Sequence, residues 1–207
     1  MERIYIFKGF ERFWHWTQAL LILVMLATGF EVHGAWKLLG YERAGGVHVM
    51  AAWALITLWV FAIFWHFTTG EWRQYIPTTR NVGAMLQYYL FGIFRHEPHP
   101  HRQNQLSKHN PLQRLAYLAV MLAIGPLIWF TGWFYLFYGS WADWGMDKYL
   151  SLEWVAFFHT VAAFMMLVFL IAHLYLTTAG HTPTSHIKAM ITGWEEVDAE
   201  EPAAPAK

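Results

Sequence analysis

The chain contains no cysteine among its 207 residues. Iron–sulfur clusters held by cysteine, haem attached through a C-x-x-C-H motif and disulfide bonds are therefore all excluded within this chain. Charged residues are also scarce, at 14% of the chain compared with about 25% in a typical soluble domain. The formal net charge is zero, so the chain has no excess of positive charge with which to bind a nucleic acid.

Apolar residues, in contrast, make up 57% of the chain, and aromatic residues 19%. A helix needs about 20 mostly apolar residues to cross the roughly 30 Å hydrocarbon core of a bilayer. Four segments meet this requirement, at about residues 14–32, 46–67, 112–138 and 152–177. We therefore expect an all-α membrane protein, a four-transmembrane-helix bundle contained in residues 1–192.

The parts outside the four spans predict an orientation. Residues 82–94, in the long middle connection, are apolar but too short to span, and we expect an interfacial helix there. Residues 193–207 are acidic and rich in alanine and proline, which predicts a disordered tail. Ten Lys and Arg residues lie on the side of the termini and the middle connection, and three on the opposite side. By the positive-inside rule, both termini are cytoplasmic.

Two histidines share one face of the fourth span. His159 and His173 are fourteen residues apart, which corresponds to about 21 Å along a helix and about 40° short of whole turns. Ionisable side chains inside a membrane are costly and mark functional sites. Two imidazoles on one face at different depths indicate two stacked metal centres, and non-covalent haems fit best.

Depth assigns each of these histidines a partner. His48 lies at the outer start of the second span and matches His159, and we name these two the outer couple. His15 lies at the inner start of the first span and matches His173, and we name these two the inner couple. His66 is the alternative partner for His173, since it lies eighteen residues, or five turns, from His48. Each couple could clamp one haem between two helices.

At these positions the chain resembles the dihaem cytochrome b subunits of prokaryotic respiratory complexes. Such subunits serve formate dehydrogenase-N, nickel–iron hydrogenases and thiosulfate reductases. The resemblance rests on F-E-R-F-W-H-W at residues 10–16, on His48, on K-H-N-P-L-Q-R at 108–114, and on His159 and His173. It implies the same ligand pairing as depth does, namely His48 with His159 and His15 with His173.

The resemblance also implies a quinone site beside the inner couple. In the formate dehydrogenase subunit, a run with Asn and Gln three residues apart borders the quinone pocket, and Asn110 and Gln113 match it here. His109 and Pro111 depart from that pattern. A second interpretation is structural, because Asn110 followed by Pro111 is a strong start signal for a helix.

The expected function is that of a membrane anchor carrying electrons. The resemblance implies two non-covalent b-type haems and transfer of electrons between periplasmic iron–sulfur or catalytic partner subunits and membrane menaquinone or ubiquinone. The chain would lie in a bacterial or archaeal cytoplasmic membrane, in contact with lipid, with substrate catalysis left to its partners. Two alternatives remain open: a stand-alone dihaem b cytochrome, and a non-redox transporter that uses its histidines as relays.

Overall fold

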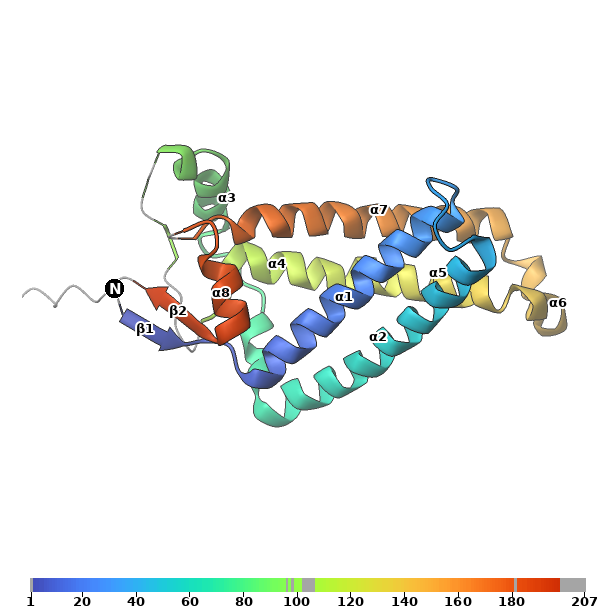
Figure 1. Cartoon of the computed structure of the whole chain (residues 1–207), viewed down its shortest axis with the longest axis horizontal. Coiled ribbons are helices and arrows are strands. Elements are labelled where there is room, and N and C mark those ends of the chain that lie inside the picture. The colour runs from blue at the N-terminus through green and yellow to red at the C-terminus, as the bar shows by residue number, and fades with distance from the viewer. Residues whose placement is uncertain (1, 96, 98, 102–106, 181, 198–207) are drawn as a thin grey trace, which may run out of the picture.

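A computed structural model describes residues 2–95, 97, 99–101, 107–180 and 182–197 of the chain. Its main body consists of long helices that run along the longest axis of the molecule (Figure 1). Four helical segments are long and apolar enough to cross a membrane: Gly9–Val32, Tyr41–Thr69, Pro111–Leu136 and Leu152–Thr177. The predicted four-helix membrane bundle is confirmed.

The first two spans are α1 (Gly9–Val32) and α2 (Tyr41–Thr69). Both begin earlier than the apolar runs predict. Glu11 accepts a hydrogen bond from the Lys8 N–H, at 2.7 Å, and so caps the start of α1. This first turn contains charged residues, so an apolar run does not include it. Helix α2 starts after Gly40, whose φ of 86° lies in the left-handed region where glycine carries no Cβ penalty.

The third span contains an irregular turn that the apolar pattern does not reveal. It consists of α4 (Pro111–Ala119), a π-helical turn η3 (Val120–Ile124) and α5 (Gly125–Leu136). The Gly125 N–H donates to the Val120 carbonyl, five residues back. Pro126 follows at once and has no N–H to donate, so a wider turn accommodates it without breaking the span.

The fourth span is α7 (Leu152–Thr177), and the long helices pack as two pairs. Helices α1 and α2 pack against each other, and α5 packs against α7. We call these the first pair and the second pair. Contact between the pairs is made by large side chains, such as Trp59 on Trp129 (ring centroids 5.5 Å apart) and Phe30 on Phe164 (5.9 Å). Backbones of the two pairs are therefore held apart by side chains.

Short elements cover the end of the bundle that carries the termini, which we call the terminal end (Figure 1). They are β1 (Glu2–Tyr5), η1 (Glu71–Tyr75), α3 (Val82–Leu90), η2 (Gly92–Arg95), α8 (Ser185–Thr192) and β2 (Trp194–Val197). The predicted interfacial helix corresponds to α3 and η2. The opposite, or far, end carries η4 (Tyr138–Ser140), α6 (Trp141–Trp144) and η5 (Met146–Lys148).

The start of the predicted disordered tail is ordered in the structure, which corrects that expectation. Strand β2 pairs antiparallel with β1, with Tyr5 opposite Trp194. The two rings meet edge to face at 5.3 Å, and Arg3 lies over the Trp194 ring at 5.7 Å. Glu195 is buried and lies 3.3 Å from His186. These contacts between the two ends of the described chain order residues 194–197. Residues 198–207 of the predicted tail lie outside the described residues.

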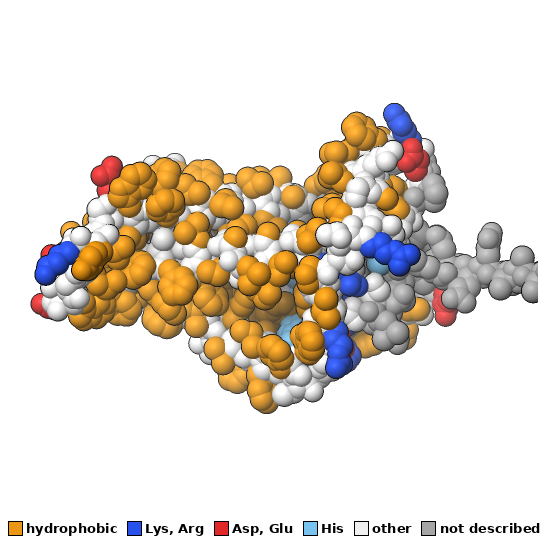
Figure 2. Space-filling view, turned by 180° about the vertical axis from the view of Figure 1, so that it is seen from behind, with side chains coloured by type: hydrophobic (Ala, Val, Ile, Leu, Met, Phe, Trp, Pro, Cys, Tyr) orange, Lys and Arg blue, Asp and Glu red, His pale blue; other side chains and the backbone are white. Residues whose placement is uncertain are grey.

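Hydrophobic side chains cover the flank of the bundle, and charged side chains gather at its two ends (Figure 2). Many large apolar residues on the long helices are strongly exposed, for example Phe64 at 68%, Val168 at 65% and Leu20 at 61%. In water such a surface would be unfavourable, whereas against lipid chains it is the expected one. The distribution fits a bundle embedded in a bilayer with both ends in water.

Candidate functional site

The four histidines predicted from the sequence meet in two couples, and each couple joins the two helix pairs. His48 on α2 and His159 on α7 have ring centroids 6.3 Å apart. His15 on α1 and His173 on α7 have centroids 6.0 Å apart. The structure therefore brings together the same side chains that the sequence pairs by depth.

Both separations fit a shared metal ion. An imidazole nitrogen binds a transition metal at about 2 Å, so two rings that share one ion have centroids roughly 6 Å apart. The rings of each couple come from helices of different pairs, whose backbones are held apart. A flat macrocycle with its metal at the centre fits such a space better than a compact ion enclosed by protein on all sides.

Each ring of the outer couple is backed by a threonine from the neighbouring helix. Thr28 Oγ1 lies 3.0 Å from His48 Nδ1, and Thr131 Oγ1 lies 3.0 Å from His159 Nδ1. Each hydroxyl donates its own hydrogen to a carbonyl four residues earlier in its helix, at 2.8 and 2.6 Å. The hydroxyl oxygen must then accept from the ring, so Nδ1 carries the proton and the Nε2 lone pair is available to a metal.

A glycine follows each of these threonines and gives the ring room. A Cβ on Gly29 would lie 3.5 Å from His48 Cε1, and a Cβ on Gly132 would lie 3.3 Å from His159 Cε1. A Cβ at Gly132 would press on the His159 ring, whereas one at Gly29 would be in ordinary van der Waals contact with the His48 ring. The Thr-Gly dipeptides at 28–29 and 131–132 thus make equivalent contacts with a histidine ring, one in each helix pair. Sequence reasoning missed the threonines, although the repeated dipeptide in two spans was visible.

The inner couple is supported differently. His15 Nδ1 is buried and has no hydrogen-bond partner among the described residues. The His15 ring meets Trp16 edge to face at 5.2 Å. His173 stacks on Phe169, with centroids 6.0 Å apart and planes 16° from parallel. Aromatic packing, rather than a hydroxyl, orients these two rings.

His66, the alternative partner of His173, lies in other surroundings. Its Nδ1 is 2.6 Å from the Ala62 carbonyl oxygen. Its ring contacts Trp14 at 5.0 Å, Trp65 at 5.0 Å and Tyr75 at 5.4 Å. Among the described ring contacts, His173 meets His15 and not His66. The geometry favours His15 as the second member of the inner couple.

Asn110 and Gln113 form a reciprocal cap at the start of α4. Asn110 Oδ1 accepts from the Gln113 N–H, and Gln113 Oε1 accepts from the Asn110 N–H, both at 2.9 Å. Asn110 Nδ2 donates to the Tyr89 hydroxyl at 2.9 Å, and Asn110 is only 3% exposed. The helix start predicted at Asn110, with Pro111 at the first helical position, is therefore present in the structure.

A buried ion cluster ties the two helix pairs together at the terminal end. Lys108 Nζ lies 2.8 Å from a Glu11 carboxylate oxygen and 2.9 Å from a Glu71 oxygen, and the Lys108 side chain is 3% exposed. Lys8 pairs with Glu71 at 2.5 Å. Burial favours a raised pKa for Glu71, but hydrogen bonds and charges from Lys8 and Lys108 outweigh it and lower the pKa of that carboxyl. The cluster fixes the start of α1 beside the start of α4.

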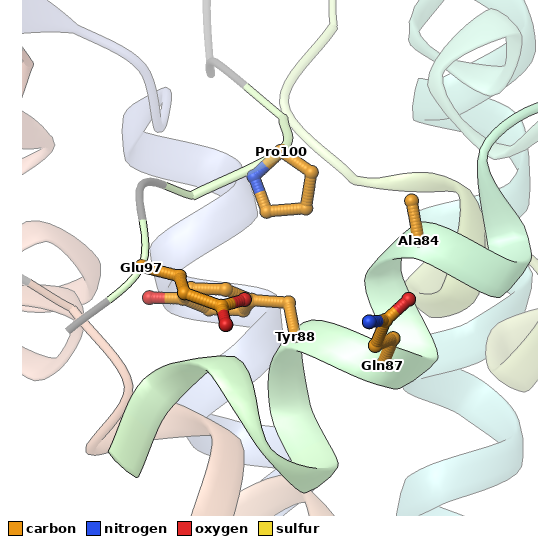
Figure 3. A pocket seen from close by; sticks show the side chains of 5 residues that line it. All are labelled: Ala84, Gln87, Tyr88, Glu97 and Pro100. Atoms are coloured by element: carbon orange, nitrogen blue, oxygen red, sulfur yellow. The ribbon is translucent and has the colours of Figure 1, made fainter. Parts of the chain in front are cut away.

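Two cavities are lined by residues other than the four histidines of the couples. One of about 190 Å³ lies beside α3, where Gln87 and Tyr88 of the helix face Glu97 and Pro100 of the following segment (Figure 3). The residues predicted to form a site do not line it. The other, of about 280 Å³, lies at the far end behind the outer couple. It is lined by Thr131, Phe134, Tyr149, Leu150, Ser151, Trp154, Val155 and Phe158.

Comparison with known proteins covers nearly the whole bundle. A family model described as prokaryotic cytochrome b561 matches residues 6–193. The putative cytochrome YdhU of Escherichia coli (strain K12) is 31% identical over 199 residues, which cover 93% of this chain and 75% of that protein. No solved structure matches the chain significantly.

More distant relatives carry a more specific description. The probable Ni/Fe-hydrogenase B-type cytochrome subunit of Cupriavidus necator is 25% identical over 210 residues, covering 84% of this chain and 79% of that protein. The subunit of the same description from Azotobacter vinelandii is 24% identical over 219 residues, covering 92% and 88%. The resemblance inferred from the histidine pattern is confirmed. With its family match from residue 6 to residue 193, the chain belongs to the prokaryotic cytochrome b561 family.

Proposed function

We propose that this chain is the dihaem b-type membrane-anchor subunit of a respiratory oxidoreductase complex. Membership in a cytochrome b family implies b-type haem, which favours a redox protein over a histidine-containing transporter. The observation that carries the proposal is the pair of histidine couples, one towards each end of the bundle, with centroids 6.3 and 6.0 Å apart.

Four residues would hold the haems: His48 and His159 the outer one, His15 and His173 the inner one. Haem iron, when bound, supplies reversible one-electron transfer. The protein contributes ring orientation, through Thr28 and Thr131 at the outer couple and aromatic packing at the inner one. The protein also keeps water away from both couples, because they lie within apolar membrane-spanning helices.

Electrons would enter or leave at the far end through a periplasmic partner subunit that carries iron–sulfur or catalytic centres. This chain has no cysteine with which to hold a cluster of its own. The far end presents exposed aromatic residues, including Trp36 at 47%, Trp144 at 57% and Tyr149 at 87% exposure. Aromatic residues are enriched both at protein interfaces and at membrane surfaces, so this end suits a docked partner at the bilayer boundary.

A membrane quinone, menaquinone or ubiquinone, would exchange electrons at the terminal end, near the inner couple. Asn110 and Gln113 lie at that end, and their capping bonds use the amide oxygens. An amide NH₂ group has two hydrogens, so Asn110 Nδ2 retains one beyond the hydrogen given to Tyr89. The helix cap and a hydrogen bond to a quinone carbonyl are thus compatible at Asn110.

Purification of the tagged chain from membranes of its own host tests this proposal. We expect b-type bands in the reduced-minus-oxidised spectrum, a co-purifying metal-containing subunit, and haem reoxidation or reduction on addition of decylubiquinone or its quinol. A preparation supplied with haem that shows no b-type bands would overturn the cytochrome function. Haem bands without any co-purifying subunit would instead favour a stand-alone cytochrome.

A further inference from the structure

Buried polar atoms without partners are concentrated at one place in the structure. The described part of the chain has five such side-chain atoms, and four of them lie where the first pair reaches the terminal end. They are Arg12 Nε, Trp14 Nε1, His15 Nδ1 and His66 Nε2. Nearly all buried polar groups in native proteins have a hydrogen-bond partner, so a cluster of exceptions indicates that something else supplies the partners.

His66 presents a buried acceptor. The residue is 8% exposed, and its Nδ1 lies 2.6 Å from the Ala62 carbonyl oxygen. A carbonyl oxygen only accepts, so Nδ1 carries the hydrogen and the neutral ring has its lone pair on Nε2. Nε2 has no partner among the described residues. Leaving such a group unsatisfied is unfavourable, and a ligand that donates a hydrogen bond to Nε2 would remove that cost.

Trp14 presents a buried donor on a ring that contacts the His66 ring. The indole ring meets the His66 ring edge to face, with centroids 5.0 Å apart. Its Nε1–H is likewise buried and has no partner in the described part of the chain. A hydroxyl group can satisfy both atoms, because it donates one hydrogen and accepts another. A carboxylate or a carbonyl could not donate to His66, and an ammonium group could not accept from Trp14.

The rings around His66 are aromatic, which suits a flat neutral ring. Tyr75 packs 5.4 Å from His66, and His109 and Tyr117 pack 5.1 and 6.0 Å from Tyr75. Burial lowers the pKa of His109 to about 3 and raises the pKa of Tyr75, so both are neutral at physiological pH. Figure 2 shows a hollow among hydrophobic side chains towards this end, with a histidine side chain visible on its floor.

We propose that Trp14 and His66 bind one hydroxyl of a membrane hydroquinone, with Tyr75 beside its ring. This inference rests on the proposed function, because it assumes that the chain exchanges electrons with the quinone pool. It assigns His66 to the quinol rather than to a haem iron. The hydroxyl donates to His66 Nε2 and accepts from Trp14 Nε1–H. A single bound water could satisfy the same two atoms, and the experiment separates these cases.

The test is a binding titration of the full chain, loaded with haem, using the fluorescent quinol analogue 2-heptyl-4-hydroxyquinoline N-oxide. His66→Phe keeps a ring but removes the acceptor, and Trp14→Phe removes the donor. Each is expected to raise the Kd of the analogue about tenfold, the effect of one lost buried hydrogen bond. Trp59→Phe is the matched control, because the Trp59 indole N–H donates to Gln18 at 2.8 Å. It should leave the Kd unchanged.

A second substitution of His66 distinguishes the loss of the acceptor from misfolding. His66→Gln retains an amide oxygen that can accept from a hydroxyl, and it should recover most of the affinity lost in His66→Phe. The haem spectrum should be the same in all these variants, which provides a readout independent of turnover.

The remaining outcomes each decide a different point. If the unmodified chain binds the analogue and neither His66→Phe nor Trp14→Phe changes the Kd, the inference is overturned. In that case a bound water satisfies these two atoms, and the proposed quinone function is unaffected. Loss of one haem in His66→Gln would overturn it by making His66 an iron ligand. Failure of the unmodified chain to bind any analogue would overturn the quinone site itself.

Discussion

Removal of the threonine behind His159 is expected to raise the midpoint potential of the outer haem. Thr131→Val preserves side-chain shape but removes the oxygen that lies 3.0 Å from His159 Nδ1. That hydrogen bond makes the imidazole a stronger electron donor and so favours the oxidised iron. A neutral hydrogen bond is worth about 1 kcal/mol. For a one-electron couple, a tenfold change in equilibrium (1.4 kcal/mol) is about 59 mV, so the rise is at most about 40 mV, the value reached if the hydrogen bond stabilises the oxidised state alone.

Thr28, the threonine behind His48, should have an effect that adds to that of Thr131. Thr28 makes the equivalent 3.0 Å contact to His48, so Thr28→Val with Thr131→Val should raise the same potential about twice as much as Thr131→Val alone, at most about 80 mV. Thr57→Val is the control, because among the described residues the Thr57 hydroxyl bonds to the Trp53 carbonyl of its own helix and not to a histidine. The assay is an optical redox titration of the purified chain. An unchanged outer potential, or an equal shift of both haems, would refute the role given to the threonines.

Three further predictions concern the terminal end. Lys108→Met leaves the buried Glu11 carboxylate without its cation and Glu71 with Lys8 alone, and should cost roughly 3–5 kcal/mol of unfolding free energy. Lys148→Met, at the exposed far end, should cost little, and equal melting curves for the two variants would refute the role of the ion cluster. Asn110→Ser should keep the helix cap but slow quinone turnover, while Asn110→Ala should also lose about 1 kcal/mol of stability; normal turnover in Asn110→Ser would restrict Asn110 to capping. His15→Ala should lose the inner haem and His66→Ala should keep it, as measured by haem content, and the reverse result would exchange their roles.

The long helices and the histidine couples could be predicted because both depend on local, periodic features. Apolar runs of the right length determine the spans, and depth along those spans decides which histidines can meet. His15 and His173 are 6.0 Å apart for this reason, although 158 positions separate them in the sequence. The alternative His66 was harder to place, because spacing alone puts it on the same face of its helix as His48.

The features that escaped prediction depend on contacts between distant segments or on single polar atoms. Thr131 is an unremarkable residue in an apolar span until its neighbour across the helix interface is known. The Lys108 cluster joins residues 97 positions apart in the sequence, and charge counting alone places Lys108 only as an orienting charge. Strand β2 forms because Trp194 meets Tyr5 at the other end of the chain, and a short acidic segment gives no local signal of this.

The ratio of haem to chain in the outer-couple variants tests the central claim most directly. The purified protein should contain two b-type haems per chain, and His48→Ala and His159→Ala should each contain one, with the spectrum of the remaining haem unchanged. That result follows if each couple, with its rings about 6 Å apart, holds one haem independently. Two haems retained in both variants, or a single haem in the unmodified chain, would contradict the account.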